Sequence, residues 1–164
     1  MIMAARASAT TARAAPLISV HSHSRGGWVP PRQAFTEWAR AALGRAGPGR
    51  EISVLVVGEA RSRALNRRYR GHDKSTNVLS FPAAKAVAGP ALLLGDLVIC
   101  PPVLRREARA QHKRLKDHWT HLFVHGLLHL IGYDHVRARD ARRMERREIR
   151  ILRGMGIANP YRSR

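Results

Sequence analysis

The chain has 164 residues, which is enough for one domain with a hydrophobic core and too few for two domains of ordinary size. Its 30 Lys and Arg residues outnumber 11 Asp and Glu residues, and the formal net charge of +19 favours a polyanionic partner. No apolar run reaches the ~18 residues that a membrane span needs, and a single cysteine, Cys100, excludes an intrachain disulfide and fits the cytoplasm.

Arginine supplies most of the positive charge, with 26 Arg against 4 Lys. The planar guanidinium fork suits phosphate groups. The coding bias of a GC-rich genome would explain why arginine replaces lysine, but it would not explain the surplus of positive over negative charge.

The first residues are small, weakly basic and free of acid. We interpret residues 1–14 as a disordered extension or as the product of a start codon assigned too far upstream. A transit peptide has the same composition and remains the alternative. Residues 15–156 are expected to form a single domain, and residues 157–164 a C-terminal tail.

The first half of the domain alternates strands and helices. Residues 16–22 alternate as a strand does, and residues 30–47 have prolines at the start, helical apolar spacing and glycines at the end. Residues 50–58 become almost continuously apolar, which is typical of a central strand. Residues 59–71 form a short basic helix that Gly71 closes.

The middle of the chain predicts two more strands and a helix. A strand over residues 75–82 ends at Pro82, and residues 85–91 form a flexible connection. Residues 92–101 form the fourth strand, and two prolines open a helix over residues 102–113.

The last part is helical. Apolar side chains keep a helical period from Asp117 to Ile131, Gly132 stops this helix, and residues 137–156 form a basic helix. The order of elements predicts an α+β fold, in which a small sheet of about four strands packs with about five helices. The histidine-rich helix is central among them.

Three histidines stand close together in "HGLLHLIGYDH", the segment that begins at His125. Residues four apart lie on one face of a helix about 6 Å apart along its axis, so His125 and His129 can converge on one metal ion. His121 and His125 have the same spacing, but His121 and His129 are too far apart to share an ion. Gly132 allows the chain to turn back and bring His135 towards the pair.

The spacing therefore predicts a metal site formed by His125, His129 and His135. About 0.002 matches to this pattern are expected by chance at this composition, so the pattern is specific. Three imidazole ligands leave a fourth position for water, which is typical of catalytic zinc, and the ion can make hydroxide near neutral pH. Nickel or another divalent ion could use the same ligands.

Each of several other polar residues has more than one expected role. His121 is expected to pack beside the site or support a ligand. Asp96 and Asp134 could orient a ligand or water, or cap a helix or turn. Arg67 and Arg68 are interpreted as a solvated basic face, and composition alone does not distinguish Arg70 from them.

Four segments together resemble the YbeY family of rRNA maturation factors, which are zinc-dependent endoribonucleases. They are "HGLLHLIGYDH", "LNRRYRGHDKSTNVLSFP", "LLGDLVIC" and "HWTHLFVHG", and the resemblance covers about residues 50 to 135. It implies a mixed four-stranded sheet, zinc ligation by His125, His129 and His135, and a catalytic role for Arg70.

The resemblance also implies a substrate and partners. The substrate is single-stranded RNA, the process is maturation of the 3′ end of the small-subunit (16S) rRNA with ribosome quality control, and the partners are the small ribosomal subunit, its proteins and the GTPase Era. No membrane partner is expected. Two alternatives remain: a non-catalytic, zinc-braced RNA-binding assembly factor, and a zinc peptidase. The peptidase pattern "HExxH" requires a glutamate where this chain has Gly126.

Overall fold

The computed structural model describes residues 15–24, 26–84 and 92–162. The extension predicted for residues 1–14 and the connection predicted for residues 85–91 lie outside these residues. The boundaries of the predicted domain and tail stay predictions. Within the described residues, one four-stranded sheet packs with five α-helices and one short 3₁₀ helix, so the predicted α+β class is confirmed.

The sheet has the strand order β1-β2-β4-β3 and is mixed. β1 pairs in parallel with β2, β2 pairs in parallel with β4, and β3 pairs antiparallel with β4. The second strand is interior, as its continuous apolar run predicts. The strand bounds are β1 Leu17–Ser22, β2 Arg50–Val56, β3 Val78–Pro82 and β4 Leu92–Ile99.

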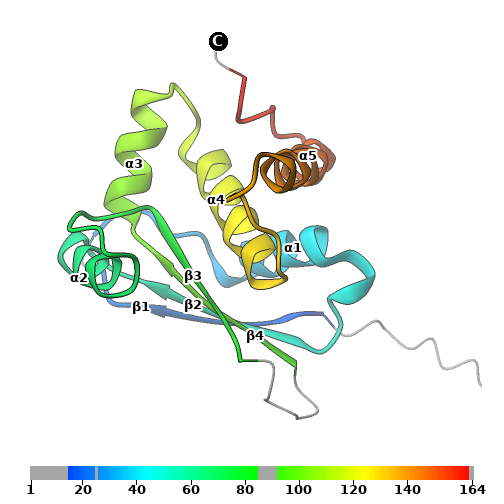
Figure 1. Ribbon diagram of the computed structural model, residues 1–164, viewed down its shortest axis with the longest axis horizontal. Coiled ribbons are helices and arrows are strands. Elements are labelled where there is room, and N and C mark those ends of the chain that lie inside the picture. Colours follow the sequence, from blue (N-terminus) through cyan, green and yellow to red (C-terminus); the bar gives the residue numbers. More distant parts are fainter. Residues whose placement is uncertain (1–14, 25, 85–91, 163–164) are drawn as a thin grey trace, which may run out of the picture.

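Helices cover both faces of this sheet, and α4 lies between α3 and α5 (Figure 1). On one face, buried side chains of the sheet meet α1, α4 and α5 in the main core. On the other face, Leu65 of α2 packs over Leu79 and Val98. The helix bounds are α1 Arg32–Leu43, η1 Gly44–Ala46, α2 Glu59–Arg70, α3 Pro101–Ala110, α4 Leu115–Leu130 and α5 Ala138–Gly154.

The main core holds α4 in a fixed position against the sheet. Trp119 and Phe123 of α4 are fully buried and pack edge-on or tilted against Phe35 of α1, at ring-centroid distances of 6.0 and 5.3 Å. Each such aromatic pair adds about 1 kcal/mol to the free energy gained by burying its apolar area. The histidines of α4 are therefore mounted on a rigid element.

The third strand is shorter than predicted, because the residues before it bind to helices instead of a neighbouring strand. The Ser62 hydroxyl of α2 bonds both backbone groups of Thr76, and the Asn77 amide donates to Glu107 of α3. Side chains thus satisfy the Thr76 backbone groups, which a neighbouring strand would otherwise bond, and the Asn77 carbonyl accepts the Cys100 N–H just after β4 at 2.9 Å. The sheet pairing therefore begins at Val78.

None of the helices in the described part of the chain has the length and apolar character that crossing a membrane requires.

Candidate metal centre

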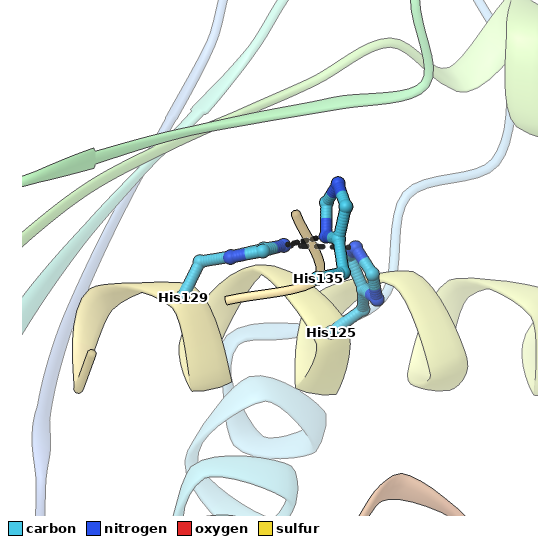
Figure 2. Close-up of side chains that lie close together, drawn as sticks. All are labelled: His125, His129 and His135. Atoms are coloured by element: carbon cyan, nitrogen blue, oxygen red, sulfur yellow. Dashed lines mark hydrogen bonds between the residues drawn. The ribbon is translucent and has the colours of Figure 1, made fainter. Parts of the chain in front are cut away.

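α4 presents a row of histidines along one side. His125 and His129, four residues apart, point their Nε2 atoms at each other at a distance of 3.2 Å (Figure 2). Both side chains are half-buried, because the opposite side of the helix carries the core residues Phe123 and Leu127. The predicted helical pairing of these two residues is present.

The chain turns back after α4 and brings in the third histidine. Gly132 has φ +94°, a left-handed conformation that side chains other than glycine rarely adopt. The turn places Nδ1 of His135 at 3.0 Å from Nε2 of His129. One ring nitrogen from each of His125, His129 and His135 lies within 4.8 Å of the others, so the structure brings together the three residues that the spacing selects.

Hydrogen bonds on the far side of two rings determine where their protons are. Nδ1 of His125 donates to the Glu148 carboxylate at 2.5 Å, and Nδ1 of His129 donates to the Tyr133 carbonyl at 2.9 Å. Neither acceptor has a proton to give when Glu148 is ionised, so each Nδ1 carries the hydrogen and each Nε2 carries a lone pair. The two Nε2 atoms are 3.2 Å apart, and their lone pairs repel each other unless a cation lies between them.

This donor set fits a zinc ion. Ligand nitrogens at 2.0–2.1 Å from zinc in tetrahedral geometry are about 3.3 Å from one another, close to the separations of 3.2 and 3.0 Å found here. Burial lowers the pKa of His129, and the neighbouring His125 lowers it further, so His129 is neutral at pH 7, as a metal ligand must be.

Glu148 of α5 belongs to the candidate site, and it is not among the residues predicted from the sequence. Its side chain is fully buried, and it contacts His125, His121 at 3.6 Å and the Tyr161 hydroxyl, which donates to it. Burial by itself raises the pKa of Glu148, but the hydrogen bonds from His121 and His125 outweigh burial and lower it. An ionised carboxylate behind His125 fixes the orientation of the ring and raises its basicity.

One feature of the sequence indicates this residue. Met144, Glu148 and Leu152 share one face of α5 at four-residue spacing, and all three are buried. Glu148 is thus an acidic residue on the apolar face of an amphipathic helix, where a charge needs a specific partner.

His121 does not join the three ring nitrogens. Its Nε2 lies near Glu148 and 3.4 Å from the Tyr161 hydroxyl, and burial lowers its pKa. It could form a second group with His125 and Glu148. In that group Glu148 already accepts the Nδ1 hydrogen of His125, so we interpret His121 as support for the carboxylate.

The two aspartates have different positions. Oδ1 of Asp134 accepts the backbone N–H groups of His135 and Val136, at 2.6 and 3.2 Å, and these bonds lower its pKa. Asp134 therefore stabilises the turn that carries His135 and does not orient an imidazole. Asp96 is an exposed residue of β4, opposite Ser53 and Phe81 in the sheet, and the structure gives it no bond to the three histidines.

Arg70 is the last residue of α2 and is exposed. Its guanidinium donates to the Ser80 carbonyl of β3 at 3.1 Å, and the buried Ser80 hydroxyl donates to the Gly126 carbonyl of α4 at 3.1 Å. Two hydrogen bonds thus connect Arg70 with the residue that follows His125. Arg70 does not hydrogen-bond any of the three histidines.

α4 packs tightly against the sheet at Gly126. A Cβ atom at this position would lie 2.9 Å from Leu97 Cδ2 and 3.1 Å from both Ser80 Oγ and Val78 Cγ2. The glutamate of the zinc peptidase pattern does not fit here, because its side chain would enter the packed interface between α4 and the sheet.

The fold and these side chains define an α+β protein with a candidate three-histidine metal centre on a buried helix. The pattern of the family described as Endoribonuclease YbeY matches residues 30–156, about three quarters of the chain. The chain therefore belongs to the YbeY family of endoribonucleases.

Individual relatives agree with this membership. Proteins named Endoribonuclease YbeY from Alkalilimnicola ehrlichii and Methylococcus capsulatus are 55% and 52% identical to the chain; each match covers 82% of it, and 83% and 88% of the relative. The one from Halorhodospira halophila is 48% identical over 87% of the chain and 94% of the relative.

A solved structure is similar in fold. The solution structure of TM1509 from Thermotoga maritima has a TM-score of 0.54 and 19% identity, and the match covers 89% of this chain and 99% of that one. At this identity the likeness shows the fold alone.

Proposed function

We propose that this endoribonuclease depends on zinc, cleaves single-stranded RNA, and acts in the cytoplasm in maturing the 3′ end of small-subunit (16S) rRNA and in ribosome quality control. Endonucleolytic hydrolysis of phosphodiester bonds follows from membership of the family. Family membership alone does not identify the metal ion, the RNA substrate or the cellular process. These parts of the proposal rest on the geometry of the site and on the resemblance of its motifs to that family.

The observation that carries the zinc proposal is that the Nε2 atoms of His125 and His129 face each other at 3.2 Å, with Nδ1 of His135 at 3.0 Å from Nε2 of His129. His125, His129 and His135 would hold the ion. Bound zinc supplies a Lewis acid and lowers the pKa of water, so that a nucleophile forms near neutral pH. Glu148 and the Tyr133 carbonyl keep the Nε2 atoms of His125 and His129 directed at one point.

Arg70 is proposed as the catalytic arginine. Attack on phosphorus increases the negative charge on the non-bridging oxygens, and a fixed guanidinium offsets that charge. The bond to the Ser80 carbonyl occupies one nitrogen of the guanidinium and holds the group in place. The other N–H groups can donate to a phosphate, because Arg70 is exposed.

The proposed partners are single-stranded rRNA, the small ribosomal subunit with its proteins, and the GTPase Era. The net charge of +19 supports binding to RNA, since counterion release from the phosphates drives such association. The ribosomal proteins and Era come from the family resemblance alone. A direct check is co-purification of the tagged, full-length chain with small-subunit rRNA.

An assay of RNA cleavage with two variants and their matched controls tests this proposal. We expect His129→Ala and Arg70→Ala to lose cleavage by 100-fold or more while keeping the wild-type circular dichroism spectrum. His112→Ala, an exposed histidine in the turn before α4, and Arg67→Ala, on the same helix as Arg70, should cleave within threefold of wild type.

Elemental analysis of the purified chain and cleavage under chelation complete the test. The proposal predicts one zinc per chain, loss of metal in His129→Ala but not in Arg70→Ala, and loss of cleavage with a chelator. If the wild-type chain binds RNA and zinc but cleaves no RNA, the non-catalytic assembly factor is correct and the catalytic proposal is wrong.

A further inference from the structure

The outer face of α5 carries a continuous row of arginines, which we call the arginine stripe. All of its members are exposed, and no acidic residue interrupts the row. Its members are Arg139, Arg142, Arg143, Arg146, Arg150 and Arg153.

Helix geometry shows that these six residues share one face. At about 100° per residue, they all lie within about 60° of a common line along the helix, and they span about 21 Å from first to last. The buried residues Met144, Glu148 and Leu152 lie on the opposite face, towards the core. The stripe is therefore directed outwards over the whole length of α5.

The stripe has no acidic partner in the described part of the chain. Among the residues that the structure describes, none of the six arginines forms an ion pair or a side-chain hydrogen bond. By contrast, Arg63 of α2, Arg106 of α3 and Arg114, which precedes α4, are each paired with an acid. Like charges three and four residues apart on a helix repel each other and destabilise it. The row therefore contributes no ion pair to folding, whereas a bound polyanion would pair with its charges.

The stripe begins at the loop that forms the metal centre. α5 starts three residues after His135, and the Arg143 guanidinium lies over the Tyr133 ring at 5.4 Å. The carbonyl of the same Tyr133 holds His129 in place. A chain of phosphates that leaves the metal centre along this loop therefore meets the stripe directly.

We propose that the arginine stripe binds the phosphodiester backbone of RNA outside the cleavage site and holds long substrates on the enzyme. This rests on the proposed function for the identity of the polyanion. Guanidinium groups bind phosphate oxygens in pairs, and such contacts position RNA without reading its sequence. The stripe would therefore increase affinity for long RNA and leave the chemistry at the metal centre unchanged.

A membrane surface fits this helix less well than RNA does. Interfacial helices insert an apolar face between lipids while basic residues contact the headgroups. The apolar face of α5, with Met144, Ile151 and Leu152, is already buried in the protein core. The remaining surface is charged and has no apolar face to insert.

Two full-length variants with equal loss of charge test this proposal. The stripe variant combines Arg142→Gln, Arg146→Gln, Arg150→Gln and Arg153→Gln. The control variant combines Arg40→Gln, Arg45→Gln, Arg105→Gln and Arg109→Gln, which are exposed arginines of α1, η1 and α3. Glutamine forms helices about as well as arginine does, so both variants are expected to fold. Circular dichroism and thermal unfolding verify this.

Binding to a single-stranded RNA of about 30 nucleotides is measured by fluorescence anisotropy at several salt concentrations. Each contact with a phosphate of single-stranded RNA contributes about 0.7 to the slope of the logarithm of the binding constant against the logarithm of the salt concentration. We expect the stripe variant to bind at least tenfold more weakly near 0.15 M salt, with a slope smaller by about 2 to 3. The control variant should change less than threefold. Cleavage of an RNA of about six nucleotides should keep its kcat in both variants, because the metal centre is intact.

Equal weakening in both variants would show that only net charge matters and would overturn the proposal, as would wild-type RNA binding by the stripe variant. Loss of binding to anionic phospholipid vesicles without loss of RNA binding would assign the stripe to membranes and would also overturn it. Failure of the proposed function is distinguishable: the wild-type chain would then cleave no RNA, while its stripe-dependent binding could still be measured.

Discussion

Glu148 is expected to affect metal binding without touching the position where an ion would lie. We expect Glu148→Ala to weaken zinc binding about 10- to 100-fold, because His125 loses the acceptor that orients its ring and makes it more basic. Glu148→Gln keeps an acceptor but loses the charge, so a smaller effect is expected. Competition with a chromogenic chelator measures these affinities.

Glu145→Gln is the matched control for this prediction, since Glu145 is an exposed acid on the same helix. It should bind zinc as the wild type does. If Glu148→Ala folds and has wild-type zinc affinity, Glu148 does not position the ligand.

Acidification is expected to destabilise the metal-free protein. The pKa values of His129 and His121 are both lowered, mainly by burial, below the ordinary value of 6.5. The unfolded chain therefore binds more protons than the folded chain below about pH 6.5, and the free energy of unfolding falls as the pH decreases through the folded pKa values. Glu148, whose pKa is also lowered, adds a second loss below its ordinary value of 4.5.

Urea unfolding of the metal-free chain between pH 5 and pH 8 measures this dependence. We expect a loss of stability from pH 7 to pH 5 that is smaller in His121→Phe, because one of the two histidines is absent. Stability that stays constant or rises over this interval would contradict the assigned pKa directions.

Among the elements, α4 was predictable from the sequence because its signal is local. Its apolar period and Gly132 gave its extent to within two residues, and four-residue spacing paired His125 with His129. Local spacing could not predict which residues from other elements support this part of α4. Glu148 is 23 residues away from His125 in the sequence, and Arg70 is connected to α4 only through Ser80 of another element.

The interface between α4 and β3 gives a prediction about Gly126. Replacing a helical glycine by alanine normally stabilises a helix by up to about 1 kcal/mol. Here the added Cβ overlaps Leu97, a fully buried side chain, so we expect Gly126→Ala to lower the free energy of unfolding by about 1–3 kcal/mol. Equilibrium unfolding in urea measures the change.

Gly154→Ala is the matched control, because Gly154 is a glycine of α5 with open space around its Cβ position. It should leave the stability unchanged or raise it slightly. Equal effects of the two alanine substitutions would show that close packing does not explain Gly126.

For the whole molecule, fold class and charge were predictable because they depend on average properties of the sequence. The alternation of elements predicts an α+β domain whichever way the strands pair. Which arginines lack an acidic partner was less predictable, since ion pairs depend on how the chain folds. Arg63 forms an ion pair with Asp73, whereas the arginines of the stripe on α5 form none in the described part of the chain.

Binding of a metal ion is expected to stabilise the whole molecule. Without a cation, the converging lone pairs of His125 and His129 repel each other in the folded state only. Zinc at 100 times its Kd adds about 2.7 kcal/mol to the free energy of unfolding. For a chain of this size that raises Tm by about 5–10 °C. Scanning calorimetry with and without zinc measures the shift, and His129→Ala should show a much smaller one. A shift of equal size in His129→Ala would place the bound metal elsewhere in the protein.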